Sequence, residues 1–210
     1  MFRTMIAVID YGIGNLRSVQ RAIERVRGSV QLVSTGAALA RAEKIVLPGV
    51  AAFGDAMGQL QSMSLAEPLV KAIKEGIPYL GFCLGLQLLF DVSYEDGQHT
   101  GLGILPGKVV RFEFPPSVTG RRLAVPHMGW NQIRIVRPCP MLKKIQTNSY
   151  AYFAHSYHVV PVDQEIVTTT TEYGYEFVSS IWHKNIFATQ FHPEKSQAVG
   201  LKILENFVNL

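Results

Sequence analysis

Strand-like and helix-like segments alternate along the first half of the chain, and this alternation limits the possible folds more than any other feature. Short apolar runs predict strands, whereas apolar residues spaced three and four apart predict helices. The predicted strands are 5–9, 30–33, 44–47 and 77–82, and the predicted helices are 14–26, 53–61, 67–74 and 84–91. Such alternation is typical of a parallel sheet covered on both faces. We therefore predict an α/β fold of three layers, with helices flanking a mostly parallel central sheet.

The second half of the chain is rich in Val, Ile, Thr, Tyr and Phe, which favour strands. Strands are predicted at 108–114, 133–136, 150–160, 165–171 and 178–191, followed by a closing helix at 196–208. We expect these additional antiparallel or mixed strands to extend the first sheet. Because neither a repeat nor a linker is evident, we predict a single domain over residues 1–210.

Basic residues are in excess, and the formal net charge of +4 raises the question of nucleic-acid binding. Arg17, Arg21 and Arg25 are four residues apart, so they share one face of the first predicted helix. That face lacks the basic density or interleaved aromatic residues of a nucleic-acid surface. We interpret it as a solvated helix face and predict no nucleic-acid partner.

The two cysteines and the apolar runs indicate the cellular compartment of the protein. Cys83 and Cys139 are too few for a disulfide framework in 210 residues, which favours a reducing, cytoplasmic compartment. No apolar run approaches the ~20 residues of a membrane span. We therefore expect a cytoplasmic protein without a membrane partner.

Cys83 stands where a strand is predicted to end and a helix to begin. The segment Gly81-Phe82-Cys83-Leu84-Gly85 has the nucleophile-elbow pattern, with cysteine in place of serine. The glycines permit a sharp turn, and the helix N-terminus stabilises negative charge on the sulfur. We interpret Cys83 as a nucleophile and the Leu84 N–H as an oxyanion donor. The alternative is a buried structural cysteine.

His192 is the one histidine of six with a carboxylate two residues further on. In an extended segment residues i and i+2 point the same way, so Glu194 can orient the ring and stabilise its charged form. By itself this segment is more typical of a solvated turn. Together with Cys83 it forms a Cys-His-Glu triad suited to acyl transfer.

Two other patterns do not carry a site. The segment 12–17 follows the first strand but lacks the third glycine of a dinucleotide fingerprint. His155 and His158 are three residues apart in strand sequence, so we expect them on opposite faces of a sheet. We therefore predict neither a cofactor nor a metal.

The motifs resemble those of the class I (triad) glutamine amidotransferases nearly from end to end. General marks of the family are Leu47-Pro48-Gly49, the elbow continued to Gln87, and Gln190-Phe191-His192-Pro193-Glu194. Within the family the chain looks most like the glutaminase subunits of imidazole glycerol phosphate synthases. The segments that carry this closer resemblance are Asp10-Tyr11-Gly12-Ile13-Gly14-Asn15, Pro126-His127-Met128-Gly129-Trp130-Asn131, His155-Ser156-Tyr157 and Glu194-Lys195-Ser196.

The resemblance implies glutamine hydrolysis through a thioester on Cys83, with His192 first protonating the departing ammonia and then activating water. It implies that backbone N–H groups of Leu84 and of the Gly49-Val50 loop hold the oxyanion. In the family this loop can reorient when the partner is occupied. The implied contacts to glutamine itself are Gln87, Glu95, Ala51, Ser156 and Tyr157.

Ala51 departs from the family pattern, which usually has glycine there. Alanine keeps the backbone N–H but does not easily adopt a positive φ. We therefore expect the resting geometry of this loop, or its reorientation, to differ.

A second protein is expected to use the ammonia, because the glutaminase domain takes up the whole sequence. By resemblance, this partner is a (β/α)8-barrel cyclase of histidine biosynthesis that makes imidazole glycerol phosphate and an aminoimidazole carboxamide ribonucleotide. The resemblance places five residues on the face toward it: Tyr11, Asn15, Met128, Trp130 and Lys195. For Met128 and Trp130 the alternative is core packing.

Other functions remain open at this stage. A paralogous glutaminase could serve another synthase, for example in surface-sugar biosynthesis. A catalytically silent interaction scaffold would keep the fold without turnover, although the intact triad argues against it. A cysteine peptidase or another amide hydrolase on a similar sheet is disfavoured by Gln87.

Overall fold

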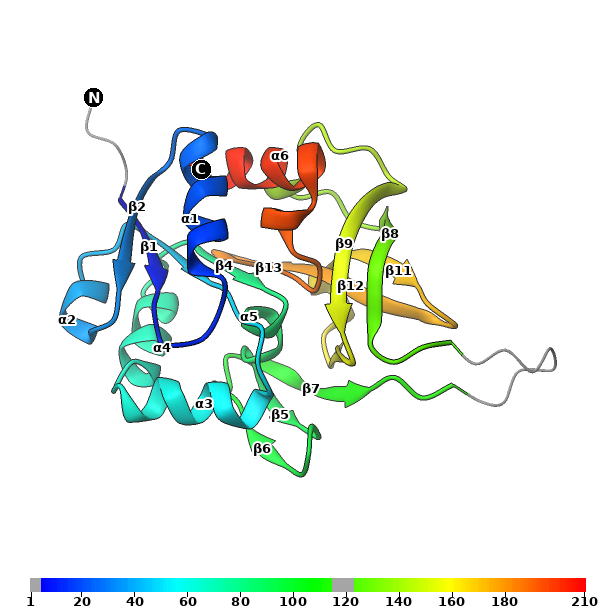
Figure 1. The fold of residues 1–210 in the computed structure, drawn as a ribbon, viewed down its shortest axis with the longest axis horizontal. Coiled ribbons are helices and arrows are strands. Elements are labelled where there is room, and N and C mark those ends of the chain that lie inside the picture. Colours follow the sequence, from blue (N-terminus) through cyan, green and yellow to red (C-terminus); the bar gives the residue numbers. More distant parts are fainter. Residues whose placement is uncertain (1–4, 115–122) are drawn as a thin grey trace.

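Two sheets and the helices packed around the larger one make up the fold (Figure 1). The computed structural model describes residues 5–114 and 123–210. The helices are α1 (Leu16–Arg25), α2 (Gly36–Leu39), α3 (Phe53–Ser62), α4 (Ala66–Lys74), α5 (Leu84–Gln87) and α6 (Gln197–Val208). Three short 3₁₀ turns are η1 (Pro140–Leu142), η2 (Gln164–Ile166) and η3 (Pro193–Lys195). None of the helices in these described ranges is long and apolar enough to cross a membrane.

The larger sheet has nine strands in the described part of the chain. Their order is β2 (Ser29–Val33), β1 (Met5–Ile9), β3 (Lys44–Leu47), β4 (Tyr79–Phe82), β13 (Ile186–Thr189), β12 (Glu176–His183), β11 (Val167–Glu172), β8 (His127–Ile135) and β9 (Ser149–His155). Neighbours from β2 to β13 are parallel, whereas those from β13 to β9 are antiparallel. The predicted central sheet and its antiparallel extension are confirmed.

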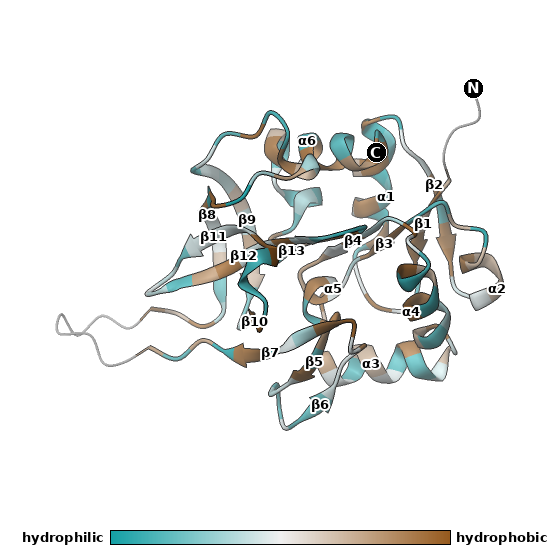
Figure 2. Cartoon of the chain, turned by 180° about the vertical axis from the view of Figure 1, so that it is seen from behind, coloured by the Kyte–Doolittle hydropathy of each residue, from teal (hydrophilic) through white to brown (hydrophobic). Residues whose placement is uncertain are grey.

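Helices cover both faces of this sheet, as predicted. Along β1, Ile6 and Val8 pack with α1 and α6, whereas Ala7 and Ile9 pack with α3 and α4. This separation follows from the alternation of side chains along a strand. In Figure 2 hydrophobic residues run along β1, and hydrophilic patches lie on α1, α3 and α4. The arrangement is the expected three-layer one.

A second, four-stranded sheet was not predicted. Its order is β10 (Tyr157–Pro161), β7 (Leu105–Arg111), β5 (Phe90–Ser93) and β6 (His99–Thr100). The helix predicted at 84–91 ends early, because the carbonyls of Leu88 and Leu89 accept from backbone N–H groups of residues 102, 104 and 105. The strand predicted at 150–160 is divided at Ser156, whose carbonyl accepts from Phe112 N–H.

This division also corrects the prediction that His155 and His158 face opposite sides. Both rings pack against Phe112, with centroid distances of 5.2 and 4.8 Å. The strict alternation of a strand does not continue through the break at Ser156. Still, no group of three or more metal-ligating side chains occurs within residues 5–114 and 123–210.

Two neighbouring parallel strands, β4 and β13, bring the predicted catalytic residues together. Phe82 lies beside Thr189 in the register of this pair. Cys83 directly follows β4, and His192 comes three residues after the end of β13. In open α/β sheets, ligands bind beyond the carboxyl ends of such strands. The site is therefore expected at this edge.

Candidate active site

Cys83 occupies a tight turn between β4 and α5. Its φ of 50° and ψ of −99° are unusual for a residue with a side chain. Backbone hydrogen bonds hold the turn: Cys83 N–H donates to Thr189 O at 2.7 Å, and Cys83 O accepts from Leu86 N–H at 3.0 Å and from Gln87 N–H at 3.3 Å. Backbone strain of this kind concentrates at functional sites.

The glycines of the elbow permit close packing of backbone on backbone. A Cβ on Gly81 would lie 2.4 Å from the carbonyl oxygen of Gly85. A Cβ on Gly85 would lie 2.0 Å from the carbonyl oxygen of Leu47 in β3. These two positions therefore require glycine, as the elbow pattern predicts.

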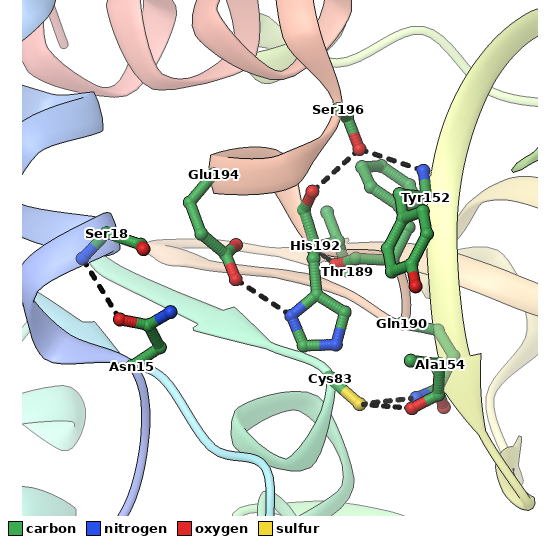
Figure 3. A network of polar contacts seen from close by, with 11 residues as sticks. Asn15, Ser18, Cys83, Tyr152, Ala154, Thr189, Gln190, His192, Glu194 and Ser196 are labelled. Carbon is green, nitrogen blue, oxygen red and sulfur yellow. Dashed lines mark hydrogen bonds and ion pairs between the residues drawn. The ribbon is translucent and has the colours of Figure 1, made fainter. Parts of the chain in front are cut away.

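His192 and Glu194 form a buried pair beside Cys83 (Figure 3). Nδ1 of His192 lies 2.9 Å from Oε1 of Glu194, and both side chains are almost completely buried. The backbone of His192 is held as well: its N–H donates to Tyr152 O, and its carbonyl accepts from Ser196 Oγ. Among the described residues, Nε2 of His192 has no hydrogen-bond partner. That nitrogen is thus available for a reacting group.

The electrostatics of the pair favour the imidazolium form of His192. Burial lowers the pKa of His192, but the negative charges that Cys83 and Glu194 can carry outweigh it and raise the pKa to about 10. A carboxylate buried beside a neutral ring would be left without a compensating charge. The ring is therefore protonated near neutral pH and ready to act as an acid.

The two predicted oxyanion donors lie side by side. A Cβ on Gly49 would lie 2.7 Å from the Cβ of Leu84, so the 49–50 loop rests directly on the start of α5. Within the described ranges, none of the N–H groups of Gly49, Val50 and Leu84 donates to another group. Ala51 does not have a positive φ. These N–H groups are therefore available as donors to an oxygen atom bound near Cys83.

Tyr11 is not on a partner-facing surface, in contrast to the role implied by the resemblance. Its side chain is completely buried, and its hydroxyl donates to Pro48 O at 2.8 Å. The same hydroxyl lies against Gly49. Burial, and then the negative charge that Cys83 can carry, raise the pKa of Tyr11 well above its usual value. The hydroxyl therefore stays neutral and holds the backbone of the predicted oxyanion loop at Pro48 and Gly49.

Gln87 lies one turn into α5 and is held in place by two carbonyl oxygens. Its Nε2 donates to Tyr157 O at 3.0 Å and to Oε1 of Gln190 at 3.2 Å. Two further predicted substrate contacts lie here: Ser156 separates β9 from β10, and Tyr157 is the first residue of β10. The structure thus brings three of the predicted glutamine contacts to one place.

Glu95 connects the oxyanion loop to the region after β5. Its Oε2 accepts from the N–H of Phe53, the first residue of α3, at 2.8 Å. Burial raises the pKa of the Glu95 carboxyl. The carboxylate therefore helps to fix the segment that directly follows Ala51.

The remaining residues implied at the partner face are exposed. Asn15 caps α1, with its Oδ1 accepting from Ser18 N–H (Figure 3). Met128 and Trp130 on β8 are 65% and 46% exposed, which excludes core packing in this structure. Lys195 is also exposed, and its Nζ lies 5.7 Å from the centroid of the Tyr152 ring.

Gln190 is a site residue to which the sequence analysis assigned no role. Its Nε2 lies 3.4 Å from Sγ of Cys83, and the residue is completely buried (Figure 3). It stands two residues before His192, and this i, i+2 spacing could have indicated a shared side. The sulfur also contacts the carbonyl oxygen of Ala154 at 3.9 Å.

Comparisons with known proteins agree with this geometry. The family "Glutamine amidotransferase class-I" matches residues 7–210. The chain is 52% identical to the imidazole glycerol phosphate synthase subunit HisH of Syntrophotalea carbinolica, over 97% of this chain and 98% of that one. It is 49% identical to the subunit of the same name from Geobacter sulfurreducens, again over 97% and 98%.

Solved structures show the same fold at lower identity. The PurLQS structure from Thermotoga maritima superposes with a TM-score of 0.74 at 20% identity and covers 99% of both chains. The sequence relatives and the family match together go beyond a shared fold. The chain belongs to the class I glutamine amidotransferase family and, within it, to the group of imidazole glycerol phosphate synthase subunits HisH.

Proposed function

We propose that the chain hydrolyses glutamine to glutamate and ammonia as the glutaminase subunit of an imidazole glycerol phosphate synthase in histidine biosynthesis. The observation that carries this proposal is Cys83, held at a positive φ before α5 and beside the buried His192–Glu194 pair. The names of the relatives support the reaction and the pathway. Family resemblance supports a single amidotransferase domain and a cytoplasmic location.

The reaction begins with acyl transfer to the sulfur. Sγ of Cys83 attacks the side-chain carbonyl carbon of glutamine and forms a tetrahedral intermediate, whose collapse breaks the C–N bond and leaves the C–S bond of the thioester. Imidazolium His192 gives its Nε2 proton to the leaving nitrogen, which departs as ammonia. Glu194 keeps Nδ1 protonated and the ring in place. The N–H groups of Leu84 and of the 49–50 loop hold the negative oxygen of the tetrahedral intermediate.

Hydrolysis of the thioester completes the cycle. Neutral His192 accepts a proton from water, whose oxygen attacks the γ-glutamyl carbonyl carbon. The C–S bond breaks, glutamate leaves, and the sulfur of Cys83 and the protonated ring of His192 are ready for the next cycle. No cofactor is needed for these steps.

The α-amino-acid end of glutamine is bound by hydrogen-bond acceptors and by backbone groups. An α-ammonium group is recognised by oxygen atoms, and Oε1 of Gln87 and the Glu95 carboxylate supply them. Ala51, Ser156 and Tyr157 contribute backbone contacts. The Glu95 carboxylate also holds the Phe53 N–H, so substrate binding and the oxyanion loop share one side chain.

A cyclase subunit receives the ammonia. By family resemblance this partner is a (β/α)8 barrel that makes imidazole glycerol phosphate and an aminoimidazole carboxamide ribonucleotide. The exposed side chains of Met128 and Trp130, together with Asn15 and Lys195, are the proposed contacts. Apolar side chains and tryptophan are enriched at such interfaces. The buried Tyr11 supports the oxyanion loop instead.

Substitution of the nucleophile tests the proposed reaction. We expect Cys83→Ala to lower the rate of glutamine hydrolysis at least about 10⁴-fold, because no other group forms the thioester. Cys139→Ala is the matched control, because this second cysteine lies away from the site, beside η1. The measurement is glutamate release with the cyclase present. Unchanged turnover in Cys83→Ala would exclude the triad mechanism.

A further inference from the structure

A continuous chain of buried and partly buried hydrogen bonds runs from strand β8 to the proposed nucleophile. It enters the site through two histidines that the proposed mechanism does not use. In order, its members are Asn131, His127, His155, Tyr157, Gln87, Gln190 and Cys83. The direction of each bond can be assigned because backbone groups fix both ends of the histidine pair.

At the outer end, the backbone fixes the amide of Asn131. Its Oδ1 accepts from Gln132 N–H at 2.8 Å, and its Nδ2 donates to Glu172 O at 2.9 Å. The second proton of Nδ2 then points to Nε2 of His127, 3.2 Å away. Nε2 of His127 must therefore be the accepting nitrogen, which leaves the proton of the neutral ring on Nδ1.

At the inner end, the carbonyl of Tyr157 fixes the tautomer of His155 independently. It lies 2.8 Å from Nδ1 of His155 and can only accept, so this nitrogen carries a proton. In the neutral ring Nε2 of His155 is then an acceptor. It lies 3.1 Å from Nδ1 of His127, the nitrogen already assigned as a donor. The two assignments agree, and every bond from Asn131 to Tyr157 has one donor and one acceptor.

The surroundings hold both rings in place and keep them neutral. His127 is stacked between Tyr173 and Phe153, with centroid distances of 4.0 and 4.8 Å. His155 packs against Phe112 and Phe177. Burial lowers the pKa of His127 to about 4 and that of His155 to about 3. An imidazolium in this aromatic cluster would be poorly solvated.

The inner half of the chain determines how Gln87 is presented. Both protons of its Nε2 are used, on Tyr157 O and on Oε1 of Gln190. Gln190 then turns its own Nε2 to Sγ of Cys83. The amide of Gln87 therefore cannot flip without losing two bonds, and its Oε1 is left for a ligand. A fixed acceptor at this point suits the α-ammonium group of an amino acid.

We propose that His155, locked by His127 in the Nδ1–H tautomer, is a positioning residue that fixes the Tyr157 carbonyl and with it the Gln87 amide that binds glutamine. This inference rests on the proposed function for the identity of the ligand. The tautomers themselves do not depend on it. The role belongs to binding rather than to bond breaking, because neither ring contacts the reacting atoms.

Substitutions of His155 separate a positioning role from a general loss of structure. His155→Phe keeps the ring and removes both nitrogens, and we expect KM for glutamine to rise about 10-fold while kcat falls less than about 3-fold. His155→Asn returns an amide nitrogen at the place of Nδ1 and should restore KM to within about 3-fold of wild type. His155→Gln places its amide nearer the former Nε2, out of reach of Tyr157 O, and should behave like His155→Phe.

His158→Phe is the matched control. This histidine is buried in the same aromatic cluster, against Phe112 and Tyr175. Its nitrogens lie near Val159 O and the Tyr175 hydroxyl, so it takes no part in the chain to Cys83. We expect its KM for glutamine to stay at the wild-type value.

Nitrogen NMR of the histidine rings tests the tautomers directly in the full-length wild-type chain. Long-range ¹H–¹⁵N spectra at neutral pH should show Nδ1–H and unprotonated Nε2 for His127 and His155. The His127→Gln and His155→Gln variants assign the signals. An Nε2–H tautomer or an imidazolium at either residue would overturn the proposal, even if the His155 variants fail to fold.

The kinetic results distinguish this inference from the proposed function. If wild-type protein with its cyclase does not hydrolyse glutamine, the proposed function is wrong. If it does, two results would show that the positioning role is wrong. In the first, KM for His155→Phe equals that of wild type. In the second, His155→Phe, His155→Asn and His155→Gln all have the same KM. A rise in KM that only His155→Asn reverses supports it.

Discussion

The pairing of His192 with Glu194 decides which protonation state the site offers at rest. Their side chains are only 2% and 4% exposed, and the 2.9 Å contact lies within one short turn. Because both groups are removed from water, either one charged alone would be costly. The pair therefore keeps its proton on the imidazole over the physiological range, in the form that the proposed mechanism needs as an acid.

Removing the charge of Glu194 tests that role. We expect Glu194→Gln to lower kcat for glutamine hydrolysis by about 10²–10⁴-fold, because the amide stabilises neither the imidazolium nor the correct tautomer. Glu176→Gln is the control, since this exposed carboxylate pairs with Arg134 away from the site. Steady-state kinetics with the cyclase present provide the measurement. A kcat for Glu194→Gln within about twofold of wild type would remove Glu194 from the mechanism.

The raised pKa of His192 also predicts how stability depends on pH. The folded chain binds a proton that the unfolded chain loses above about pH 6.5, so the free energy of unfolding includes a contribution that is complete below that pH. This contribution is lost as the pH rises toward about 10. We expect wild type to lose more stability than His192→Gln between pH 7 and 10, measured by urea unfolding. Parallel curves for the two proteins would contradict the assigned pKa.

At the scale of elements, the elbow shows how closely β3, β4 and α5 are packed. The Gly85→Ala substitution would place a methyl group against the Leu47 carbonyl oxygen, which cannot move without breaking the sheet. We expect it to lower the free energy of unfolding by about 1–3 kcal/mol. Gly58→Ala in α3 is the control, because nothing lies within 4 Å of the added Cβ. There we expect a gain of about 0.5–1 kcal/mol. Denaturant unfolding measures both, and equal effects would refute the packing argument.

Elements whose signals are local in sequence could be predicted. The alternation of apolar strands and amphipathic helices up to β4 gave the parallel core, and a glycine two residues on either side of Cys83 gave the elbow. The second sheet could not be predicted, because its strands are defined by distant pairings. Nothing near Phe90 indicates that β5 pairs with β7. The run 150–160 is divided at Ser156 because β9 pairs with β8 and β10 pairs with β7, and neither pairing is visible in the local sequence.

The same distinction holds within the site. His192 and Glu194 are two residues apart, so their contact could be read from the sequence. Gln190, His127 and His155 gain their significance from partners on other strands, and composition alone suggests core packing for them. Tyr11 was misplaced for a related reason: a tyrosine after a strand gives no sign of whether its hydroxyl meets solvent or, as here, Pro48 O.

On the scale of the whole molecule, the exposed apolar residues and the site lie on connected elements. Met128 and Trp130 are on β8, which also carries His127 and Asn131. β8 pairs with β9, whose Ala154 carbonyl lies 3.9 Å from Sγ of Cys83. A partner bound over β8 would therefore touch the strand pair that lines the proposed nucleophile.

This connection predicts that the partner controls the rate. We expect the chain alone to hydrolyse glutamine slowly, and addition of the cyclase with its nucleotide substrate to raise kcat/KM at least about 10-fold, within the usual range of coupling between sites.

Trp130→Ala should weaken the complex, because an exposed tryptophan buried on binding contributes much of the affinity. Its glutaminase activity without partner should equal that of wild type, since the side chain lies outside the hydrogen-bond chain to Cys83. Fast hydrolysis by the chain alone, or stimulation by an unrelated synthase in place of the cyclase, would argue against the proposed partner.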